Sequence, residues 1–202
     1  MNEFFSLLIE QVYQTTWLEA VAVVFGLLSV WYSKQENILV YPTGIVSVLI
    51  YVYLTFAYKL YADMGINAYY FVMSVYGWYN WTNTKGNKSQ IPVSWNSRKE
   101  NLTSIAFFTI SFLLIRWILL DFTDSDVPNW DAVTTSFALV GMWLMAKKKI
   151  ENWIAWIITD IISVPLYFYK GLPFTAFQYL VFTGLAIWGY FAWRKSFSEK
   201  HG

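Results

Sequence analysis

Three side chains at helical spacing could bind a small solute. Asn152, Trp156 and Asp160 are each four residues apart, so they stack on one face of a helix. A hydrogen-bonding amide, a stacking indole and a carboxylate together suit a flat, positively charged ligand. Polar groups are costly inside an apolar helix, which favours a functional role for the three. The alternative is a structural triad that hydrogen-bonds to neighbouring helices.

Asp160 is the only acidic residue that we expect close to the centre of the bilayer. The neighbouring turns contain no lysine or arginine. A buried carboxylate needs a compensating cation or a proton. A bound cationic solute would supply the first, and protonation of the carboxyl group is the other possibility.

Polar side chains also occur on two further apolar segments, and those on the first are at helical spacing. They are Asn67, Tyr70 and Ser74 on residues 62–81, and Gln178 and Thr183 on residues 173–193. We include all five among the candidate substrate-binding residues.

Sequence motifs of enzymes are absent. The chain has no cysteine, and His201, next to the C-terminus, is its one histidine. No Gly-x-Ser-x-Gly, His-Glu-x-x-His or P-loop pattern occurs. We therefore expect no catalytic residue, no cofactor and no metal, and the net charge of +1 gives no reason to expect nucleic acid as a partner.

Composition indicates that a membrane surrounds the chain. Of the 202 residues, 57% are hydrophobic and only 13% charged, against roughly 25% charged in soluble domains. The apolar residues form blocks long enough to cross a ~30 Å hydrocarbon core. The expected spans are 17–33, 38–58, 62–81, 102–120, 130–146, 150–169 and 173–193, preceded by a short interfacial helix at 3–14.

The basic residues predict how these spans are oriented. With seven spans and the N-terminus outside, the loops on the inside contain most of the 14 lysines and arginines. The inside set is Lys34, Lys85, Lys88, Arg98, Lys99, Lys147, Lys148, Lys149, Arg194, Lys195 and Lys200. Lys59 and Lys170 fall outside, and Arg116 lies within a span.

An internal repeat relates the first and last three spans. Glu19-Ala20-Val21 matches Asp131-Ala132-Val133, and the aromatic run 76–81 matches 188–193, both at an offset of 112 residues. Glu36-Asn37 with Tyr41 matches Glu151-Asn152 with Trp156 at an offset of 115. We attribute the difference of three residues to the loop after the second helix, and Tyr41 joins the candidate site as the counterpart of Trp156.

The predicted fold class is an all-α membrane protein with two parallel three-helix repeats joined by a linker helix. Its parts are an N-terminal interfacial segment (1–16), the first repeat (17–81), a cytoplasmic loop with the linker helix (82–129), the second repeat (130–193) and a cytoplasmic tail (194–202). Parallel repeats of this kind are typical of transporters that bind substrate near the midplane.

The motifs resemble the PnuC family of bacterial vitamin transporters. The resemblance is carried by Trp17-Leu18-Glu19-Ala20-Val21, Leu60-Tyr61-Ala62-Asp63, Tyr76-Gly77-Trp78-Tyr79 and Glu151-Asn152-Trp153-Ile154-Ala155-Trp156. It covers nearly the whole chain apart from residues 82–101 and the tail. It implies a multi-pass protein of the bacterial inner membrane with a three-plus-one-plus-three fold like that of full-length SWEET transporters.

The resemblance also implies a function. Members of the family carry nicotinamide riboside, and relatives carry thiamine, riboflavin or deoxynucleosides, by facilitated diffusion with trapping by a cytoplasmic kinase. Asn152 and Trp156 match the family's residues at the nicotinamide end of the ligand. Asp160 stands where many nicotinamide riboside carriers have a neutral Asn, so thiamine, also a cation, is the alternative substrate, whereas the carboxylate argues against riboflavin or a neutral nucleoside.

Further partners and other classes of function stay open. Membrane lipid and the kinase are the partners that we expect besides the substrate, and a homo-oligomer is compatible with the sequence. A seven-helix receptor or an intramembrane enzyme is the alternative from another class. Residues 173–193 contain no lysine, which disfavours a retinal-binding receptor, and the missing catalytic motifs disfavour the enzyme.

Overall fold

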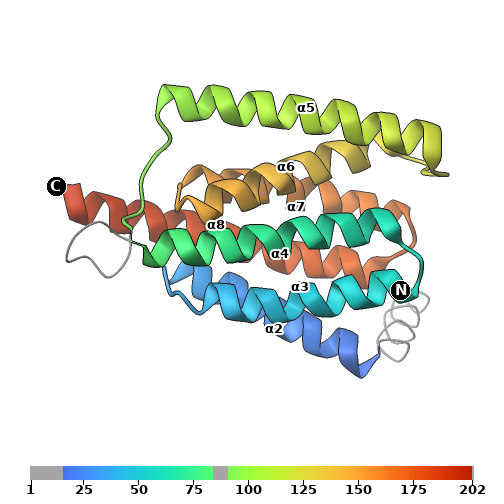
Figure 1. Cartoon of the computed structure of the whole chain (residues 1–202), viewed down its shortest axis with the longest axis horizontal. Helices are drawn as coiled ribbons and strands as arrows, with labels where there is room; N and C mark the ends of the chain where they lie inside the picture. Colours follow the sequence, from blue (N-terminus) through green and yellow to red (C-terminus); the bar gives the residue numbers. More distant parts are fainter. Residues whose placement is uncertain (1–15, 84–90, 202) are drawn as a thin grey trace. The chain divides into compact units, whose positions relative to one another are not determined.

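Seven α-helices make up the part of the chain that this computed structural model describes, residues 16–83 and 91–201. They are α2 (Trp17–Lys34), α3 (Val40–Ala57), α4 (Tyr61–Thr82), α5 (Arg98–Phe122), α6 (Pro128–Ala146), α7 (Glu151–Tyr169) and α8 (Pro173–His201), drawn in Figure 1. The all-helical fold class is therefore confirmed. The interfacial helix expected at 3–14 lies outside the described residues.

Local sequence signals set several of the helix ends. The Thr16 hydroxyl accepts a hydrogen bond from the Glu19 amide and caps α2. Ser97 and Glu100 cap each other's backbone amides in a capping box at the start of α5. Pro128 occupies the first turn of α6, where its missing N–H has no helical partner to lose. At the other end of the chain, residues 194–201 continue α8 and do not form a separate tail.

Four of the seven helices are long and apolar enough to cross a membrane by composition alone. They are α2, α3, α5 and α8. The other three, α4, α6 and α7, have 22, 19 and 19 residues, a similar length. Polar residues within them, such as Asp63 and Asn67 in α4 and Asn152 and Asp160 in α7, lower their hydropathy.

The chain divides into two compact units, Met1–Pro92 and Val93–Gly202, which we call unit 1 and unit 2. In unit 1, α3 packs between α2 and α4. In unit 2, α7 packs between α6 and α8, and the linker helix α5 packs on α6, as Figure 1 shows. The middle helix of each unit is thus in contact with both of its neighbours.

The backbone repeats between the units at an offset of 112 residues. In both units the turn after the first helix contains one residue with a left-handed backbone, Glu36 (φ 55°) and Lys148 (φ 58°). The turn after the second helix does the same with Lys59 (φ 59°) and Gly171 (φ 71°). The predicted repeat is therefore present in the local geometry of each unit.

Side-chain packing repeats at the same offset. Tyr41 meets Trp81 edge-on, with ring centroids 5.2 Å apart and planes at 86°. In unit 2 Trp153 and Trp193 form the same contact at 5.5 Å and 86°. The Ser47 hydroxyl donates to the Ala22 carbonyl over 2.8 Å, and Thr159 donates to the Thr134 carbonyl over 3.4 Å.

This geometry corrects one step of the sequence alignment. We expected Tyr41 to correspond to Trp156, with three extra residues in the loop after the second helix. The left-handed turns keep the offset at 112 on both sides of the second helix, so the counterpart of Tyr41 is Trp153. The Glu-Asn pairs had matched by residue type, but they occupy different positions in their units.

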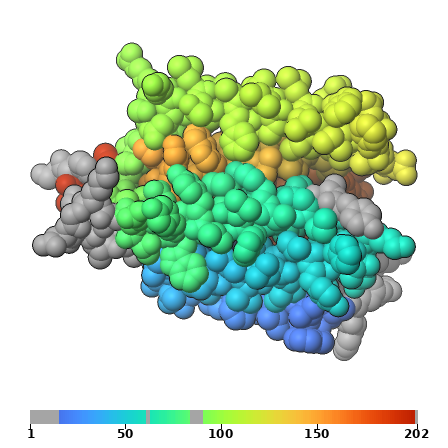
Figure 2. Space-filling model, in the orientation of Figure 1, coloured from blue at the N-terminus to red at the C-terminus, as the bar shows by residue number. Residues whose placement is uncertain are grey.

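The outer face of α5 is apolar and uncovered. Figure 2 shows its yellow-green surface exposed along the helix in that view. Leu102, Ile105, Ile110 and Leu113 are each at least 58% exposed. A face of this kind suits contact with lipid tails and would be unfavourable in water.

Candidate functional site

The candidate site lies on α7, the middle helix of unit 2. Asp160 is the tenth of the 19 residues of α7 and is only 4% exposed. Within the described residues, nothing donates a hydrogen bond to its carboxylate and no lysine or arginine pairs with it. A carboxylate buried without a partner is unfavourable, so this position calls for a cation or a proton.

Asn152 lies two turns before Asp160, at the start of α7, and is fully buried. Its Nδ2 donates a hydrogen bond to the Lys149 carbonyl over 2.6 Å. Its Oδ1 is buried and accepts no hydrogen bond from the described residues. An acceptor in this state is suited to an N–H donor of a ligand.

Trp156 lies between Asn152 and Asp160 on the same face of α7. Its indole rests against Gly141 of α6, where a Cβ would come within 3.1 Å of Cε2 and 3.3 Å of Cδ2 and Nε1. Three consecutive ring atoms at nearly equal distance mean that the ring turns its face, and not its edge, toward Gly141. The amide, the indole and the carboxylate therefore lie along one face of α7, and their joint role in binding stays a prediction.

The internal repeat distinguishes this face from ordinary packing. At the offset of 112, the counterparts of Asn152, Trp156 and Asp160 are Val40, Gly44 and Val48. Unit 1 therefore has no amide, indole or carboxylate at these positions, although the packing contacts around them are repeated. Residues that differ between otherwise matching units are candidates for function, because the fold alone does not require them.

The other candidate residues are spread over both units. Asn67 donates to the Asp63 carbonyl within α4, and Thr183 donates to the Tyr179 carbonyl within α8. Ser74 is buried in α4, whereas Tyr70 and Gln178 are half-buried. The part of these five in binding stays a prediction.

Tyr41 belongs to the packing of unit 1. It is fully buried against Trp81, and its hydroxyl forms no hydrogen bond with the described residues. A Cβ on Gly77 would come within 2.5 Å of its ring, so its environment is tightly filled. We expected a substrate-facing role from its supposed equivalence to Trp156, and that equivalence is wrong.

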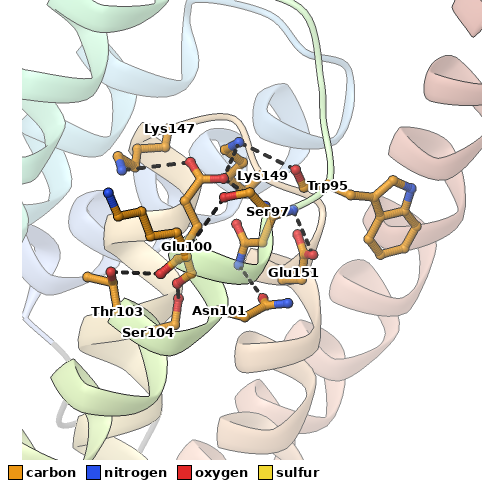
Figure 3. A network of polar contacts seen from close by, with 11 residues as sticks. Trp95, Ser97, Glu100, Asn101, Thr103, Ser104, Lys147, Lys149 and Glu151 are labelled. Atoms are coloured by element: carbon orange, nitrogen blue, oxygen red, sulfur yellow. Dashed lines mark hydrogen bonds and ion pairs between the residues drawn. The ribbon is translucent and has the colours of Figure 1, made fainter.

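A polar network ties the segment before α5 to the turn between α6 and α7 (Figure 3). Ser94 forms a parallel β-bridge with Lys149: its amide donates to the Lys148 carbonyl, and its carbonyl accepts from the Ile150 amide. The Asn96 amide donates to Glu151 Oε1 over 2.8 Å. We call residues 94–100 with 147–151 the clasp.

Ion pairs strengthen the clasp. Glu100 pairs with Lys149 over 3.0 Å and with Lys147 over 3.9 Å. The Lys149 Nζ also donates to the Trp95 carbonyl. Sequence reasoning missed this arrangement, because a short polar segment has no periodicity that indicates its partner.

A second ion pair joins α6 and α7 at the end away from the clasp, where α6 begins and α7 ends. Lys170 Nζ lies 2.7 Å from Asp131 Oδ1, and the Ser125 hydroxyl donates to Asp131 Oδ2. Sequence reasoning missed this pair too. The clasp holds one end of the α6–α7 pair, and the Asp131–Lys170 pair holds the other.

Comparison with known proteins finds a matching family and several similar transporters. The profile of the nicotinamide mononucleotide transporter family matches residues 16–195. The nicotinamide riboside transporter PnuC of Escherichia coli (strain K12) is 26% identical, with 93% of this chain and 89% of the relative covered. The riboflavin/roseoflavin transporter RibM of Streptomyces davaonensis is 25% identical over 88% of this chain and 84% of its own.

A solved structure shares the fold. The crystal structure of the vitamin B3 transporter PnuC superposes with a TM-score of 0.72 at 24% sequence identity. The match covers 97% of this chain and 90% of that one. The arrangement of helices is therefore one already seen in a transporter.

Proposed function

The chain belongs to the nicotinamide mononucleotide transporter family, and from this premise we propose that it carries nicotinamide riboside across the bacterial inner membrane. The relatives named as nicotinamide riboside transporters support this substrate. Nicotinamide riboside combines a flat heteroaromatic ring, a fixed positive charge on that ring and a carboxamide. Each of these groups has a suitable counterpart on α7.

The observation that carries the proposal is the asymmetry between the units. Asn152, Trp156 and Asp160 replace Val40, Gly44 and Val48 at matching positions of the repeat. In the proposed complex, the Trp156 indole stacks on the pyridinium ring and the Asp160 carboxylate balances its charge. The carboxamide N–H donates to Asn152 Oδ1, which accepts no hydrogen bond from the described residues.

The fixed positive charge distinguishes nicotinamide riboside and thiamine from riboflavin as ligands. Thiamine is also a cationic heteroaromatic molecule, so it is the alternative that Asp160 favours as well. Riboflavin, which the name of RibM includes, has no fixed positive charge. Binding it would leave the Asp160 carboxylate buried without compensation, which is unfavourable.

A binding assay on the purified full-length protein tests the substrate. We expect nicotinamide riboside to bind most tightly, with thiamine next and riboflavin and deoxynucleosides much weaker. Tightest binding of thiamine would keep the mechanism and change the substrate. Tightest binding of riboflavin would contradict the charge argument.

We propose that transport is facilitated diffusion and that a cytoplasmic kinase traps the substrate by phosphorylation. The lack of a P-loop in the sequence and the resemblance to the PnuC family support this mechanism. In proteoliposomes held without a membrane potential, nicotinamide riboside should equilibrate to equal concentrations on the two sides, with or without a proton or sodium gradient. Accumulation driven by either gradient would overturn the mechanism and implicate Asp160 in coupling.

A further inference from the structure

We propose that Gly141 is a positioning residue for the substrate, because its lack of a side chain makes the space in which the Trp156 indole lies. This inference rests on the proposed stacking role of Trp156. The indole faces Gly141 with Cε2, Cδ2 and Nε1, all within 3.3 Å of where a Cβ would be. Carbon atoms in ordinary contact are about 3.5–4.0 Å apart, so position 141 tolerates no larger residue without a shift of the ring.

The direction of that shift matters for binding. One face of the indole lies against Gly141 of α6, and the proposed ligand would stack on the opposite face. A methyl group at position 141 would push the ring away from α6 by a few tenths of an ångström. Binding groups must be held within about 0.5 Å of their productive position. A shift of a few tenths uses up much of that tolerance, so the depth of α6 at Gly141 sets where the ligand ring rests.

Unit 1 has a contact at the matching positions, but there the small residue and the larger residue are on the other helix of the pair. The counterparts of Gly141 and Trp156 are Ser29 and Gly44. There a Cβ on Gly44 would come within 2.9 Å of Ser29 Oγ, so the glycine is on the middle helix and the larger residue on its neighbour. In unit 2 the glycine is on α6 instead, which leaves room for an aromatic ring on α7.

The test measures dissociation constants for nicotinamide riboside and for its reduced, uncharged dihydro form. We compare wild type, Gly141→Ala, Trp156→Ala and the double variant, together with the melting temperature of each without ligand. Gly184→Ala is the matched control, because a Cβ at Gly184 meets nothing within 4 Å.

We expect Gly141→Ala to weaken both ligands about tenfold, as a misplaced platform would. The ratio of the two constants should stay at its wild-type value, because Asp160 is undisturbed; a general displacement of α7 would change that ratio. In the Trp156→Ala background, Gly141→Ala should have no further effect. The control should bind as wild type does.

Different outcomes separate this inference from the proposed function. If Trp156→Ala weakens binding but Gly141→Ala does not, the positioning role is wrong and the stacking role stands. If Trp156→Ala itself binds normally, the stacking role fails, and the inference fails with it. If Gly141→Ala does not fold, Trp156→Phe is compared with Trp156→Phe/Gly141→Ala: we expect weaker binding by the double variant, and equal binding overturns the inference.

Discussion

Trp153 meets Trp193 edge-on, with ring centroids 5.5 Å apart and ring planes at 86°. The contact closes over Gly189, where a Cβ would come within 2.6 Å of the Trp153 ring. Tyr41, Trp81 and Gly77 repeat the arrangement in unit 1. Each unit thus joins its second and third helices by an aromatic ring laid over a glycine, and this contact defines the repeat more clearly than any sequence match does.

Adding a methyl group at either glycine should destabilise the protein. Gly77→Ala and Gly189→Ala would each force a buried ring to move, and overpacking of this kind costs about 1–3 kcal/mol. Thermal unfolding in detergent measures the effect as a lower melting temperature.

Each of these glycines has a matched control on its own helix. At Gly65 in α4 and Gly184 in α8, an added Cβ would meet no atom within 4 Å. Gly65→Ala and Gly184→Ala should be neutral or slightly stabilising, because alanine favours helices by up to about 1 kcal/mol. Equal effects at all four positions would contradict the packing account.

Much of the fold was predictable because hydrophobic blocks and capping residues are local signals. The helix boundaries of α2 and α6 fall within two residues of the expected spans. The alignment of Glu36-Asn37 with Glu151-Asn152 failed because it relied on residue type, whereas the turn geometry depends on the backbone. The aromatic residues at 41, 81, 153 and 193 all obey the offset of 112 and were the better signal.

Contacts between distant segments were less accessible from the sequence. Asp131 and Lys170 are 39 residues apart, and Glu100 and Lys149 are 49 apart. Neither pair follows from periodicity, since each joins a helix end to a turn. Gly141 was also missed, although the exchange of Ser29 and Gly44 for Gly141 and Trp156 at offset 112 would have revealed it.

Breaking the clasp should lower stability. Glu100→Gln removes the ion pairs with Lys149 and Lys147, whereas the glutamine oxygen can still complete the capping box of α5. Partly exposed pairs contribute about 0.2–1 kcal/mol each, so we expect the loss of both to lower the stability by about 1 kcal/mol. The change in melting temperature measures this loss.

The control for the clasp is a solvated ion pair. Lys195 and Glu199 are 3.7 Å apart on α8, and their side chains are 78% and 65% exposed. Lys195→Gln should leave the melting temperature unchanged. A similar loss from both substitutions would show that the clasp contributes nothing specific.

The predicted orientation can be tested against a clean background, because the chain has no cysteine. We expect Asp124→Cys to react with a membrane-impermeant maleimide added to intact spheroplasts. Ser198→Cys should react only after the membrane is permeabilised, since we predict the C-terminus inside. The reverse pattern would invert the topology, and labelling of both in intact cells would require an even number of spans between them.

The central claim is that Asp160 balances the fixed positive charge of the substrate. Asp160→Asn keeps the shape of the side chain and removes its charge. Purified protein should then lose about 2–5 kcal/mol of binding free energy for nicotinamide riboside, or about thirty-fold or more in affinity. The uncharged dihydro form should bind nearly as it does to wild type.

The most direct measurement is the ratio of these two dissociation constants in wild type and in Asp160→Asn, followed across pH. In wild type, nicotinamide riboside should bind more tightly as the pH rises and the carboxyl group loses its proton. The variant should show no such dependence and a ratio shifted toward the neutral ligand. A folded Asp160→Asn protein that binds nicotinamide riboside as tightly as wild type does would show that Asp160 is structural, and would contradict this account.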